Sequence, residues 1–201
     1  MERLKRAVIL ANGAFPRKGS EARRILETAA IVVACDGAAD SYRRHYRRAP
    51  DYVVGDLDSL KGAAAGAVKI DEQETNDLAK AIRFCRERGF AIAAIVGATG
   101  KREDHTLGNI FRAMEAGIEV VTDEGRFLPI AAGKALRLRL KKGAPVSVFA
   151  TDPQTKMTSQ GLEWPLDGVR FANLYCATLN RASAAKVEIT SDHSAFVYSE
   201  K

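Results

Sequence analysis

The sequence has few cysteines, and they lie far apart. Among 201 residues only Cys35, Cys85 and Cys176 are cysteine. No Cys-x-x-Cys pair occurs, no group of His and Cys has zinc-site spacing, and the odd number argues against a disulfide framework. These absences exclude a small disulfide-stabilised fold and a structural zinc domain. They favour a protein of the reducing cytoplasm.

Long hydrophobic runs are also absent. No stretch approaches the roughly 20 apolar residues that a membrane-spanning helix needs. The apolar run Ala7–Ala11 is shorter than the core of a signal peptide, which has about 7–15 residues. It therefore predicts a first buried strand, and we expect no membrane partner.

Two common catalytic motifs are missing as well. No Gly-x-Ser-x-Gly nucleophile elbow is present. The loop Gly97–Lys101 is not a Walker A loop, because Gly97 and Gly100 are too close and Arg102 stands where Ser or Thr should follow Lys101. The sequence therefore lacks the signatures of an α/β-hydrolase and of a P-loop nucleotide triphosphatase.

The composition is that of a globular protein. Hydrophobic residues make up 46% and charged residues 28%, which argues against disorder and suits one domain or two small ones. The net charge is +6 and the pI about 9.3. Most of the excess positive charge lies after residue 125, whereas the carboxylates are concentrated before it.

The first part of the chain alternates short apolar runs with helical periodicity. Short, continuous runs rich in Val, Ile and Ala are typical of parallel strands covered on both faces. They fall at Ala7–Ala11, Ile31–Cys35, Tyr52–Gly55, Ala91–Val96 and Ile118–Thr122. Alternating strands and helices predict a doubly wound, mostly parallel α/β sheet over residues 1–125.

Two amphipathic helices are expected within this part. Apolar residues recur at i, i+3, i+4 and i+7 in two sets: Leu78, Ala81, Ile82 and Cys85, then Leu107, Ile110, Phe111 and Met114. Asn76 and Asp104 precede these sets at positions suited to capping a helix.

The sequence pattern changes after residue 125. Short β-like segments follow at Arg126–Ile130, Ala135–Leu140, Val146–Ala150, Val187–Thr190 and Ala195–Tyr198, with turn residues between them. No long helix is evident. We predict a small all-β sandwich domain over residues 126–201.

Four carboxylates follow the predicted strands or open a helix. Asp36 follows Ile31–Cys35, Asp56 and Asp58 follow Tyr52–Gly55, and Asp77 lies at the start of a helix. The carboxyl edge of an open α/β sheet is where ligands bind, and carboxylates converging there suit a divalent cation with a polyphosphate. Taken one at a time, each is equally consistent with a helix cap or a solvated turn.

The glycine-rich loop Gly97–Lys101 connects a strand to a helix. Such loops present backbone N–H groups to phosphate, and Lys101 and Arg102 could grip phosphate oxygens. Asp104 and His105 then open the helix. The alternative is an ordinary turn with surface charges and a packed or capping histidine.

The basic run Tyr42–Arg48 has the composition of a nucleic-acid patch. A run of this kind is more often a solvated helix face. We favour that interpretation and expect no nucleic-acid partner.

Four motifs, in order and spacing, resemble the thiamine pyrophosphokinase (thiamine diphosphokinase) family. They are Ala34-Cys35-Asp36-Gly37-Ala38-Ala39, Val54-Gly55-Asp56-Leu57-Asp58-Ser59, Gln73-Glu74-Thr75-Asn76-Asp77-Leu78-Ala79-Lys80-Ala81 and Gly97-Ala98-Thr99-Gly100-Lys101-Arg102-Glu103-Asp104-His105-Thr106-Leu107-Gly108-Asn109. Gly161–Leu166 resembles the family's second-domain signature, so the resemblance covers nearly the whole chain.

The resemblance implies an α/β catalytic domain that binds nucleotide and metal, then a β-sandwich that binds thiamine and forms a homodimer. The implied reaction moves the terminal diphosphate of ATP onto the hydroxyl of thiamine and releases AMP. Mg²⁺ is the implied metal and ATP the co-substrate, in a cytoplasmic enzyme.

The resemblance also implies roles for individual residues. It gives Asp56, Asp58 and Asp77 as Mg²⁺ ligands, with Asp36 beside them to polarise the attacking hydroxyl, and it adds Arg102 and Asp104 to this catalytic set. The implied nucleotide- or phosphate-binding residues are Asn12, Gly13, Gln73, Asn76, Lys80, Thr99, Gly100, Arg102 and His105. The implied thiamine-binding residues are Thr178, Asn180 and Asp104.

The chain departs from the family pattern in three places. Asn76 stands where Thr is usual, and Lys101 replaces a frequent Gly. The Ser-Asn pair near the thiamine site appears here as Leu179-Asn180, followed by Arg181-Ala182 in place of an aromatic residue. These departures concern thiamine contact more than phosphate chemistry.

Three other hypotheses stay open at this point. In the first hypothesis, the chain is a pyrophosphokinase for a different hydroxyalkyl heterocycle, as the unusual Leu179–Arg181 region suggests. The other two hypotheses are of different classes. In the second, the chain is a non-enzymatic nucleotide- or nucleic-acid-binding module that uses its basic second part. In the third, it is a Mg²⁺-dependent phosphohydrolase.

Overall fold

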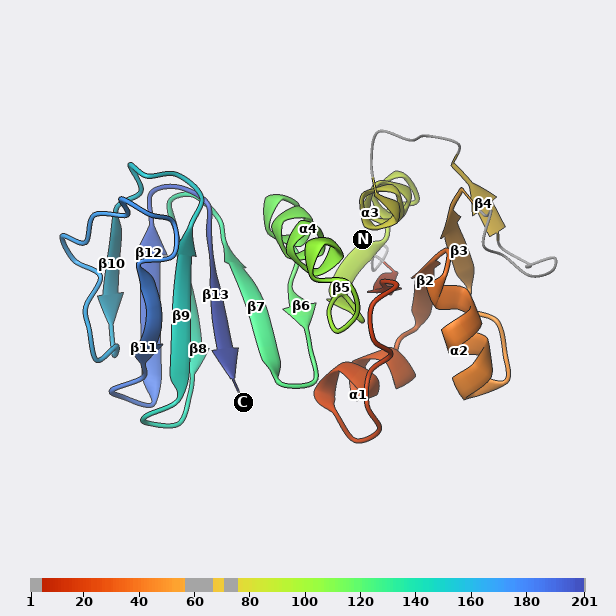
Figure 1. Cartoon of the computed structure of the whole chain (residues 1–201), viewed down its shortest axis with the longest axis horizontal. Coiled ribbons are helices and arrows are strands. Elements are labelled where there is room, and N and C mark those ends of the chain that lie inside the picture. The colour runs from red at the N-terminus through yellow and green to blue at the C-terminus, as the bar shows by residue number, and fades with distance from the viewer. Residues whose placement is uncertain (1–4, 57–66, 71–75, 201) are drawn as a thin grey trace. The chain divides into compact units, whose positions relative to one another are not determined.

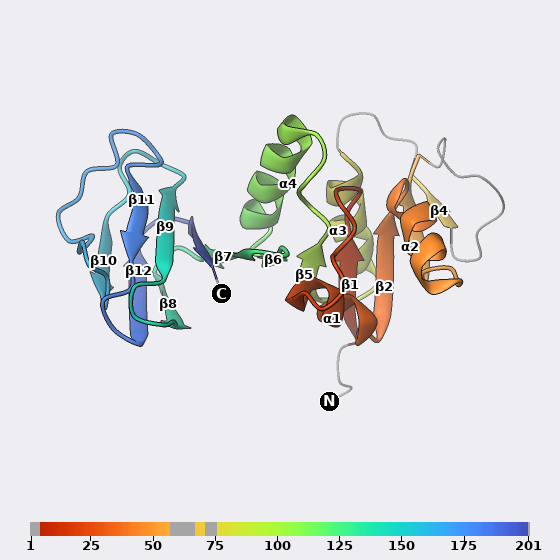
Figure 2. The same cartoon turned by 60° about the horizontal axis from the view of Figure 1, so that its bottom comes forward.

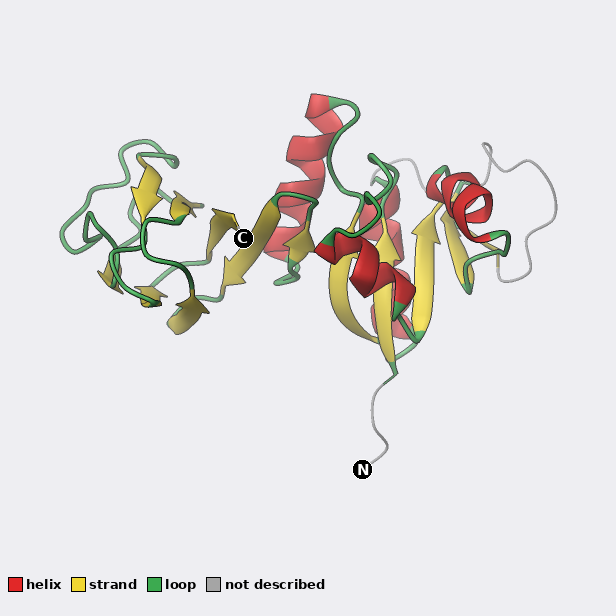
Figure 3. Ribbon diagram, turned by 90° about the horizontal axis from the view of Figure 1, so that it is seen from below, coloured by secondary structure: helices red, strands yellow, loops and turns green. Residues whose placement is uncertain are grey.

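The chain forms two compact units, Met1–Asp123 and Glu124–Lys201. The computed structural model describes residues 5–56, 67–70 and 76–200. Helices belong to the first unit, and the second is built from strands and loops (Figure 3). Among the described residues, no helix has both the length and the apolar character required to cross a membrane.

The first unit has a parallel sheet with strand order β6-β5-β1-β2-β3-β4. The strands are β1 (Arg6–Leu10), β2 (Ile31–Cys35), β3 (Tyr52–Gly55), β4 (Ala67–Lys69), β5 (Ala91–Val96) and β6 (Val120–Val121). Five of them fall where the apolar runs predicted. The short β4 has no such run and was not predicted.

Helices cover both faces of this sheet, as doubly wound topology requires (Figure 1). The helices α3 (Asp77–Glu87) and α4 (Glu103–Glu115) lie on one face. The helices α1 (Glu21–Glu27) and α2 (Ala38–Tyr46) lie on the other. Buried Val and Ala of the strands pack with Leu26 and Tyr42 of α1 and α2, so the predicted α/β fold class is confirmed.

The two predicted helix caps have different outcomes. Asn76 caps α3, since its Oδ1 accepts a hydrogen bond from the Ala79 N–H at 2.9 Å. The prediction for Asp104 is wrong, because α4 begins at Glu103 with Arg102 as its N-cap residue. Asp104 instead lies in the first turn, where its charge still suits the helix dipole.

The apolar stripe of α4 is only partly buried. Ile110 and Met114 are in the core, but Leu107 is 61% and Phe111 46% exposed. The periodicity found the helix correctly. It could not tell a surface apolar residue from a core one, because both have the same spacing along the helix.

The second unit is a β-sandwich of two antiparallel sheets, which confirms the predicted all-β domain. One sheet has the order β11-β9-β13-β7 and the other β10-β12-β8. The strands are β7 (Gly125–Ile130), β8 (Lys134–Arg139), β9 (Pro145–Ala150), β10 (Met157–Gln160), β11 (Ala177–Arg181), β12 (Lys186–Ser191) and β13 (Ala195–Glu200).

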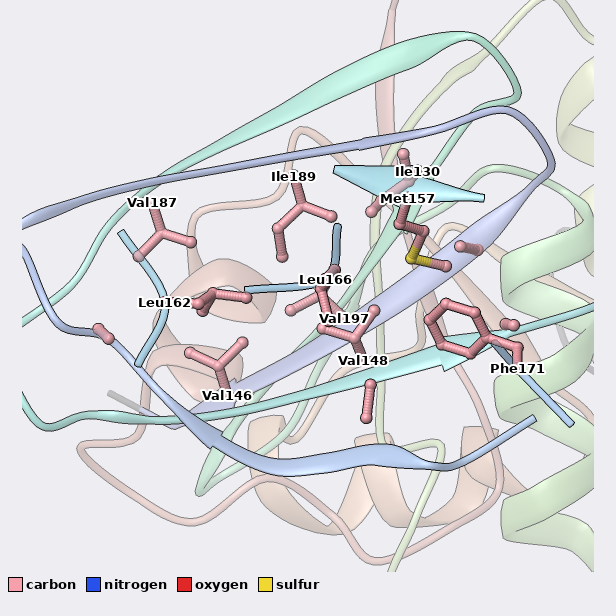
Figure 4. Close-up of a cluster of buried hydrophobic side chains, with 14 of the residues drawn as sticks. Ile130, Val146, Val148, Met157, Leu162, Leu166, Phe171, Val187, Ile189 and Val197 are labelled. Atoms are coloured by element: carbon pink, nitrogen blue, oxygen red, sulfur yellow. The ribbon is translucent and has the colours of Figure 1, made fainter. Parts of the chain in front are cut away.

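Side chains from both sheets form one hydrophobic core (Figure 4). Val146, Val148 and Val197 come from one sheet, and Val187 and Ile189 from the other. The connection between β10 and β11 adds the fully buried ring of Phe171 to this core. The sandwich therefore depends partly on a segment with no regular secondary structure.

We predict that Phe171→Ala lowers the free energy of unfolding by about 3–5 kcal/mol, because it removes a fully buried ring and leaves a cavity. Urea denaturation followed by circular dichroism measures the change. Tyr175→Ala is the matched control in the same connection, since Tyr175 is 64% exposed. Equal losses in the two variants would contradict the assignment of Phe171 to the core.

Candidate active site

The candidate site lies at the carboxyl edge of the parallel sheet, where the chain leaves β1 toward one side and β5 toward the other (Figure 2). The loops after these strands are joined by backbone hydrogen bonds. The Gly13 N–H donates to the Gly97 carbonyl at 2.7 Å, and the Ala14 N–H donates to the Thr99 carbonyl at 2.7 Å. The two loops therefore behave as one backbone surface.

Glycine makes this close approach possible. A Cβ atom on Gly13 would collide with the carbonyl oxygens of Gly97 and Thr99. Gly97 and Gly100 have φ of 65° and 84°, in the left-handed region that favours glycine. The sequence predicted a phosphate-type loop here, and the geometry gives a tight glycine-rich turn before α4.

Asn12 is wedged between two neighbouring loops. Its Oδ1 accepts a hydrogen bond from Lys101 Nζ at 3.1 Å, and its side chain fills the space that a Cβ atom on Gly37 would occupy. Across the turn, Asn109 of α4 donates from Nδ2 to the Ala98 carbonyl at 3.0 Å. These bonds hold the Gly97–Lys101 loop from both sides.

Three carboxylates gather at the ends of β2, β3 and the start of α3. Gly55 allows them to approach, since a Cβ atom there would lie 2.6 Å from Asp36 Cβ and 3.4 Å from Asp77 Oδ1. Asp36 is buried, with 3% of its surface exposed, while Asp56 and Asp77 are half-buried. Three negative charges are thus concentrated in a partly desolvated region.

This concentration of charge shows in the titration of Asp77. Burial raises the pKa of its carboxyl, and the charges of Asp56 and Asp36 raise it further. Lys80 opposes the shift: its Nζ lies 3.6 Å from Asp77 Oδ1, and its side chain is only 4% exposed. A buried lysine beside a carboxylate cluster supplies partial neutralisation, and a bound cation would supply more.

Arg102 and Asp104 form an exposed bidentate ion pair at the start of α4. Arg102 Nη2 lies 2.6 Å from Asp104 Oδ2, and Nε lies 3.1 Å from Oδ1. The hydrogen bond from Arg102 lowers the pKa of the Asp104 carboxyl to about 2, and the His105 N–H also donates to it. Both groups therefore stay charged over the physiological pH range.

A cavity of about 480 Å³ brings most of the predicted residues of the first unit together. Of those residues, Asn12, Gly13, Asp56, Asn76, Asp77, Lys80, Arg102, Asp104 and His105 line it. Asp36, Thr99 and Gly100 do not; Asp36 is buried next to Gly55, and the neighbouring Cys35 lines the cavity instead. Asp58 and Gln73 lie outside the described residues.

Within the described part of the chain, no group of three or more His, Cys, Asp or Glu side chains is arranged to hold a metal ion unaided. The cavity therefore offers oxygen ligands from Asp56 and Asp77 without a complete coordination sphere.

Sequence reasoning missed several lining residues on α4, among them Thr106, Gly108 and Asn109. A signal was present: Arg102, His105 and Asn109 recur at helical spacing and define a polar face. The sequence analysis used only the apolar stripe of this helix, which indicates core packing and not the polar face.

Arg43 and Arg44 of the basic run make contacts inside α2. Arg43 pairs with Asp40 at 3.3 Å, and Arg44 donates to Ser41 Oγ at 3.0 Å. The Arg48 guanidinium lies over the ring of buried Tyr42, 5.7 Å from its centroid.

A second cavity, of about 350 Å³, lies in the β-sandwich unit. It is mostly apolar and is lined by Trp164, Pro165, Leu166, Val169, Cys176, Ala177, Thr178, Leu179 and Asn180. The two residues predicted to bind thiamine from this unit, Thr178 and Asn180, are therefore neighbours in one pocket.

Asn180 has most of its polar capacity engaged by backbone. Its Oδ1 accepts from the Trp164 N–H at 3.2 Å and from the Arg181 N–H at 2.8 Å, and its Nδ2 donates to the Trp164 carbonyl at 2.7 Å. The side chain is buried, with 4% of the residue exposed. Asn180 thus ties the Trp164 segment to β11.

Comparisons with known proteins agree on the family. A family model for the thiamin pyrophosphokinase catalytic domain matches residues 22–122, and one for the thiamin pyrophosphokinase substrate-binding domain matches residues 125–198. Among curated proteins, no match was found.

Solved structures share the fold over the whole chain. Thiamin pyrophosphokinase from Candida albicans has a TM-score of 0.75 at 15% identity, covering 98% of this chain and 89% of its own. The enzyme from Geobacillus thermodenitrificans has a TM-score of 0.75 at 19% identity, and the match covers 98% of this chain and 97% of that one. The yeast enzyme has a TM-score of 0.73 at 13% identity, and the match covers 100% of this chain and 87% of that one.

The two family models together span nearly the whole chain, and their boundary falls between the two compact units. The chain therefore belongs to the thiamin pyrophosphokinase family of enzymes.

Proposed function

We propose that this chain transfers the terminal diphosphate of ATP to the hydroxyl of thiamine in a Mg²⁺-dependent reaction, giving thiamine diphosphate and AMP. The hydroxyl oxygen of the acceptor loses its proton to solvent and forms a bond to the β-phosphorus of ATP. The bond from that phosphorus to the α,β-bridging oxygen breaks, and AMP leaves. Chemistry of this kind needs in-line positioning and charge neutralisation more than covalent help from the protein.

The observation that carries the proposal is the mixed charge of the first cavity. Asp56 and Asp77 line it together with Lys80, Lys101 and Arg102. The carboxylates alone would repel a polyphosphate, whereas the basic side chains alone would bind it without a metal. Both charge types in one cavity suit a polyphosphate that carries a divalent cation.

The donor set fits Mg²⁺. This ion prefers oxygen ligands and usually takes one or two carboxylates, with phosphate and water completing its shell. We assign Asp56 and Asp77 to it, with Asp58 as a third ligand by family resemblance. When bound, the ion neutralises phosphate charge. Asp36 adds to the negative potential at Asp77. By family resemblance it also polarises the attacking hydroxyl.

The remaining cavity residues are assigned to ATP. Lys80, Lys101 and Arg102 bind phosphate oxygens, with Arg102 exchanging its pairing with Asp104 for phosphate. The backbone around Thr99 and Gly100 supports the phosphate loop. Asn12, Gly13, Asn76 and His105 complete the nucleotide-binding set in the cavity. Family resemblance adds Gln73.

We further propose a division of labour between the domains, 1–125 for nucleotide and metal and 126–201 for thiamine. Thr178 and Asn180 belong to the acceptor pocket, and family resemblance adds Asp104 to the thiamine-binding residues of the working assembly. That assembly is a homodimer, and the exposed Leu107 and Phe111 of α4 supply apolar surface for a second copy. The free thiols of all three cysteines suit the cytoplasm.

The direct test is the reaction itself. Purified protein with ATP, thiamine and MgCl₂ is expected to give thiamine diphosphate and AMP in equal amounts, measured by ³¹P NMR and chromatography. EDTA should abolish turnover, and added MgCl₂ should restore it. ADP or free phosphate as the product would instead indicate a kinase or phosphohydrolase, and a faster reaction with another hydroxyalkyl heterocycle would reassign the acceptor.

Asp77→Asn is expected to lower kcat at least 100-fold while the fold is retained. The pKa of the Asp77 carboxyl is raised, so the native state holds this proton more tightly than the unfolded chain does. The stabilising contribution is present at low pH and is lost as pH rises through the folded pKa. At neutral pH without metal, the variant should therefore melt at the wild-type temperature or above it.

Asp56→Asn should lower kcat to a similar extent as Asp77→Asn. Asp40→Asn is the control, because Asp40 lies outside the cavity. Asp40 lies on α2, does not line the cavity, and forms an ion pair with Arg43 one turn away at 3.3 Å. Near wild-type kcat in Asp56→Asn or Asp77→Asn at ordinary Mg²⁺ would refute the metal assignment.

Gly55→Ala tests the crowding of the carboxylates. The added Cβ would lie 2.6 Å from Asp36 Cβ, so we expect turnover to fall at least tenfold and stability by about 1–3 kcal/mol. Gly108→Ala is the steric control for stability, because nothing lies within 4 Å of a Cβ there. Steady-state kinetics and thermal unfolding measure both effects; an unchanged kcat in Gly55→Ala would show that the carboxylate spacing is not critical.

A further inference from the structure

The loop 11–20, between β1 and α1, holds its shape without regular secondary structure. Its first residues, 11–13, line the cavity of the candidate active site. The hydrogen bonds from the N–H groups of Gly13 and Ala14 attach the loop to the Gly97–Lys101 loop on its inner side. A loop attached on one side only can still move as a unit, so its outer side matters for the geometry of the cavity.

Phe15 supplies the attachment on the outer side. Its ring stacks flat on the imidazole of His45, with ring centroids 3.9 Å apart and 6° between the planes, and its centroid lies 6.0 Å from that of Tyr46. Both partners belong to the last turn of α2. The His45 ring is itself held, because Nδ1 lies 2.8 Å from the carbonyl oxygen of Ser41. Since a carbonyl only accepts, Nδ1 donates in this hydrogen bond.

Arg23 of α1 completes this aromatic cluster. Its guanidinium carbon lies 5.0 Å from the centroid of the Phe15 ring and 4.6 Å from that of Tyr46, within the range of a cation–π interaction. Nη1 donates to the Pro16 carbonyl at 3.4 Å, and Nε lies 2.8 Å from Glu27 Oε1. The Arg23 side chain is only 11% exposed, so its charge is largely removed from water. Because α1 and α2 lie on the same face of the sheet (Figure 1), the Phe15 ring connects the two helices.

The aromatic cluster acts on the cavity only indirectly. Its side chains, Phe15, Arg23, His45 and Tyr46, do not line the cavity. Phe15 is half-buried and His45 exposed, so the stack gains less from burial than a core ring would. Phe15 does, however, directly follow the two residues whose N–H groups bond the Gly97–Lys101 loop. The effect of the cluster on the site therefore runs through the backbone of loop 11–20.

We propose that Phe15 is a positioning residue for ATP, which fixes loop 11–20 against α2 and thereby holds Asn12 and Gly13 in the geometry that binds the nucleotide. The inference rests on the proposed function. A loop that is already fixed loses little freedom on binding, whereas a loose loop must be ordered at the expense of affinity.

The proposed metal ligands belong to other elements, since Asp56 follows β3 and Asp77 begins α3. Loss of the stack on Phe15 therefore weakens the binding of ATP and leaves the chemical step nearly unchanged. A ring that served folding alone would instead change stability without changing the affinity for ATP.

The experiment measures nucleotide binding by the intact protein. Isothermal titration calorimetry with MgCl₂ and the α,β-methylene analogue of ATP gives a Kd without turnover, because the analogue lacks the α,β-bridging oxygen whose bond breaks in the proposed reaction. Phe15→Ala removes the ring. Phe15→Leu keeps apolar volume but removes the flat stack, and Phe15→Tyr keeps the stack.

Phe90→Ala is the matched control. Phe90 is also a half-buried ring in an aromatic cluster of the first unit, where it contacts Tyr52 and Phe84. It precedes β5, however, and so lies at the amino edge of the sheet and does not line the cavity.

We expect the Kd to rise about tenfold in Phe15→Ala and about fivefold in Phe15→Leu, and to stay within about twofold of wild type in Phe15→Tyr and Phe90→Ala. His45→Ala should raise the Kd as well. The double variant Phe15→Ala/His45→Ala should bind no worse than Phe15→Ala alone, because the two rings act as a unit. In the full reaction, the KM for ATP should rise while kcat and the KM for thiamine change less than about twofold.

A Kd within about twofold of wild type in both Phe15→Ala and Phe15→Leu would overturn the proposal. An equal rise in Phe90→Ala would overturn it too, because the effect would then be general destabilisation. If circular dichroism shows that Phe15→Ala does not fold, Phe15→Leu decides alone. Failure of the proposed function is seen separately in the wild-type protein: nucleotide binding without AMP formation leaves the role of Phe15 to the measured Kd values, and no nucleotide binding removes both.

Discussion

The contact between the backbone after β1 and the backbone after β5 is the constraint on which the candidate site depends. Gly13 and Ala14 donate to the carbonyls of Gly97 and Thr99, and the space allows no side chain at Gly13. This contact fixes the glycine loop, and the loop fixes the start of α4. Asn12 transmits the same constraint toward β2 through its packing on Gly37.

A second constraint is electrostatic and works against folding. Asp36, Asp56 and Asp77 are close enough for the first two to raise the pKa of the third, and Lys80 compensates only in part. Like charges held together in a partly desolvated region cost stability. Their retention beside Lys101 and Arg102 is understandable if the cavity is completed by a cationic and an anionic ligand together.

Much of the fold is accessible from sequence because burial sets composition. Ile31–Cys35, Tyr52–Gly55 and Ala91–Val96 are covered on both faces, so their apolar runs match the observed strands residue for residue. The strands β10 and β11 were missed because Thr158, Ser159, Thr178 and Asn180 carry no apolar alternation. The exposure of Leu107 and Phe111 could not be predicted, since it depends on what packs against α4.

For the site, the position of Asp56 and Asp77 at the carboxyl edge of the sheet predicted that they lie together. The burial of Lys80 and the bulge at Leu179 could not be predicted, because both depend on long-range contacts.

The three thiols have unequal surroundings. Burial raises the pKa of the Cys85 thiol to about 12, and burial with nearby carboxylates raises that of Cys35 as well. Cys176, in contrast, is exposed and lines the sandwich pocket. Under mild conditions a thiol reagent therefore finds one point of attachment on the folded chain. Any adduct there, including a disulfide between two molecules stored without reductant, would occupy the space that Trp164 and Leu179 line. Oxidation of Cys176 during purification or storage would therefore reduce access to the second cavity.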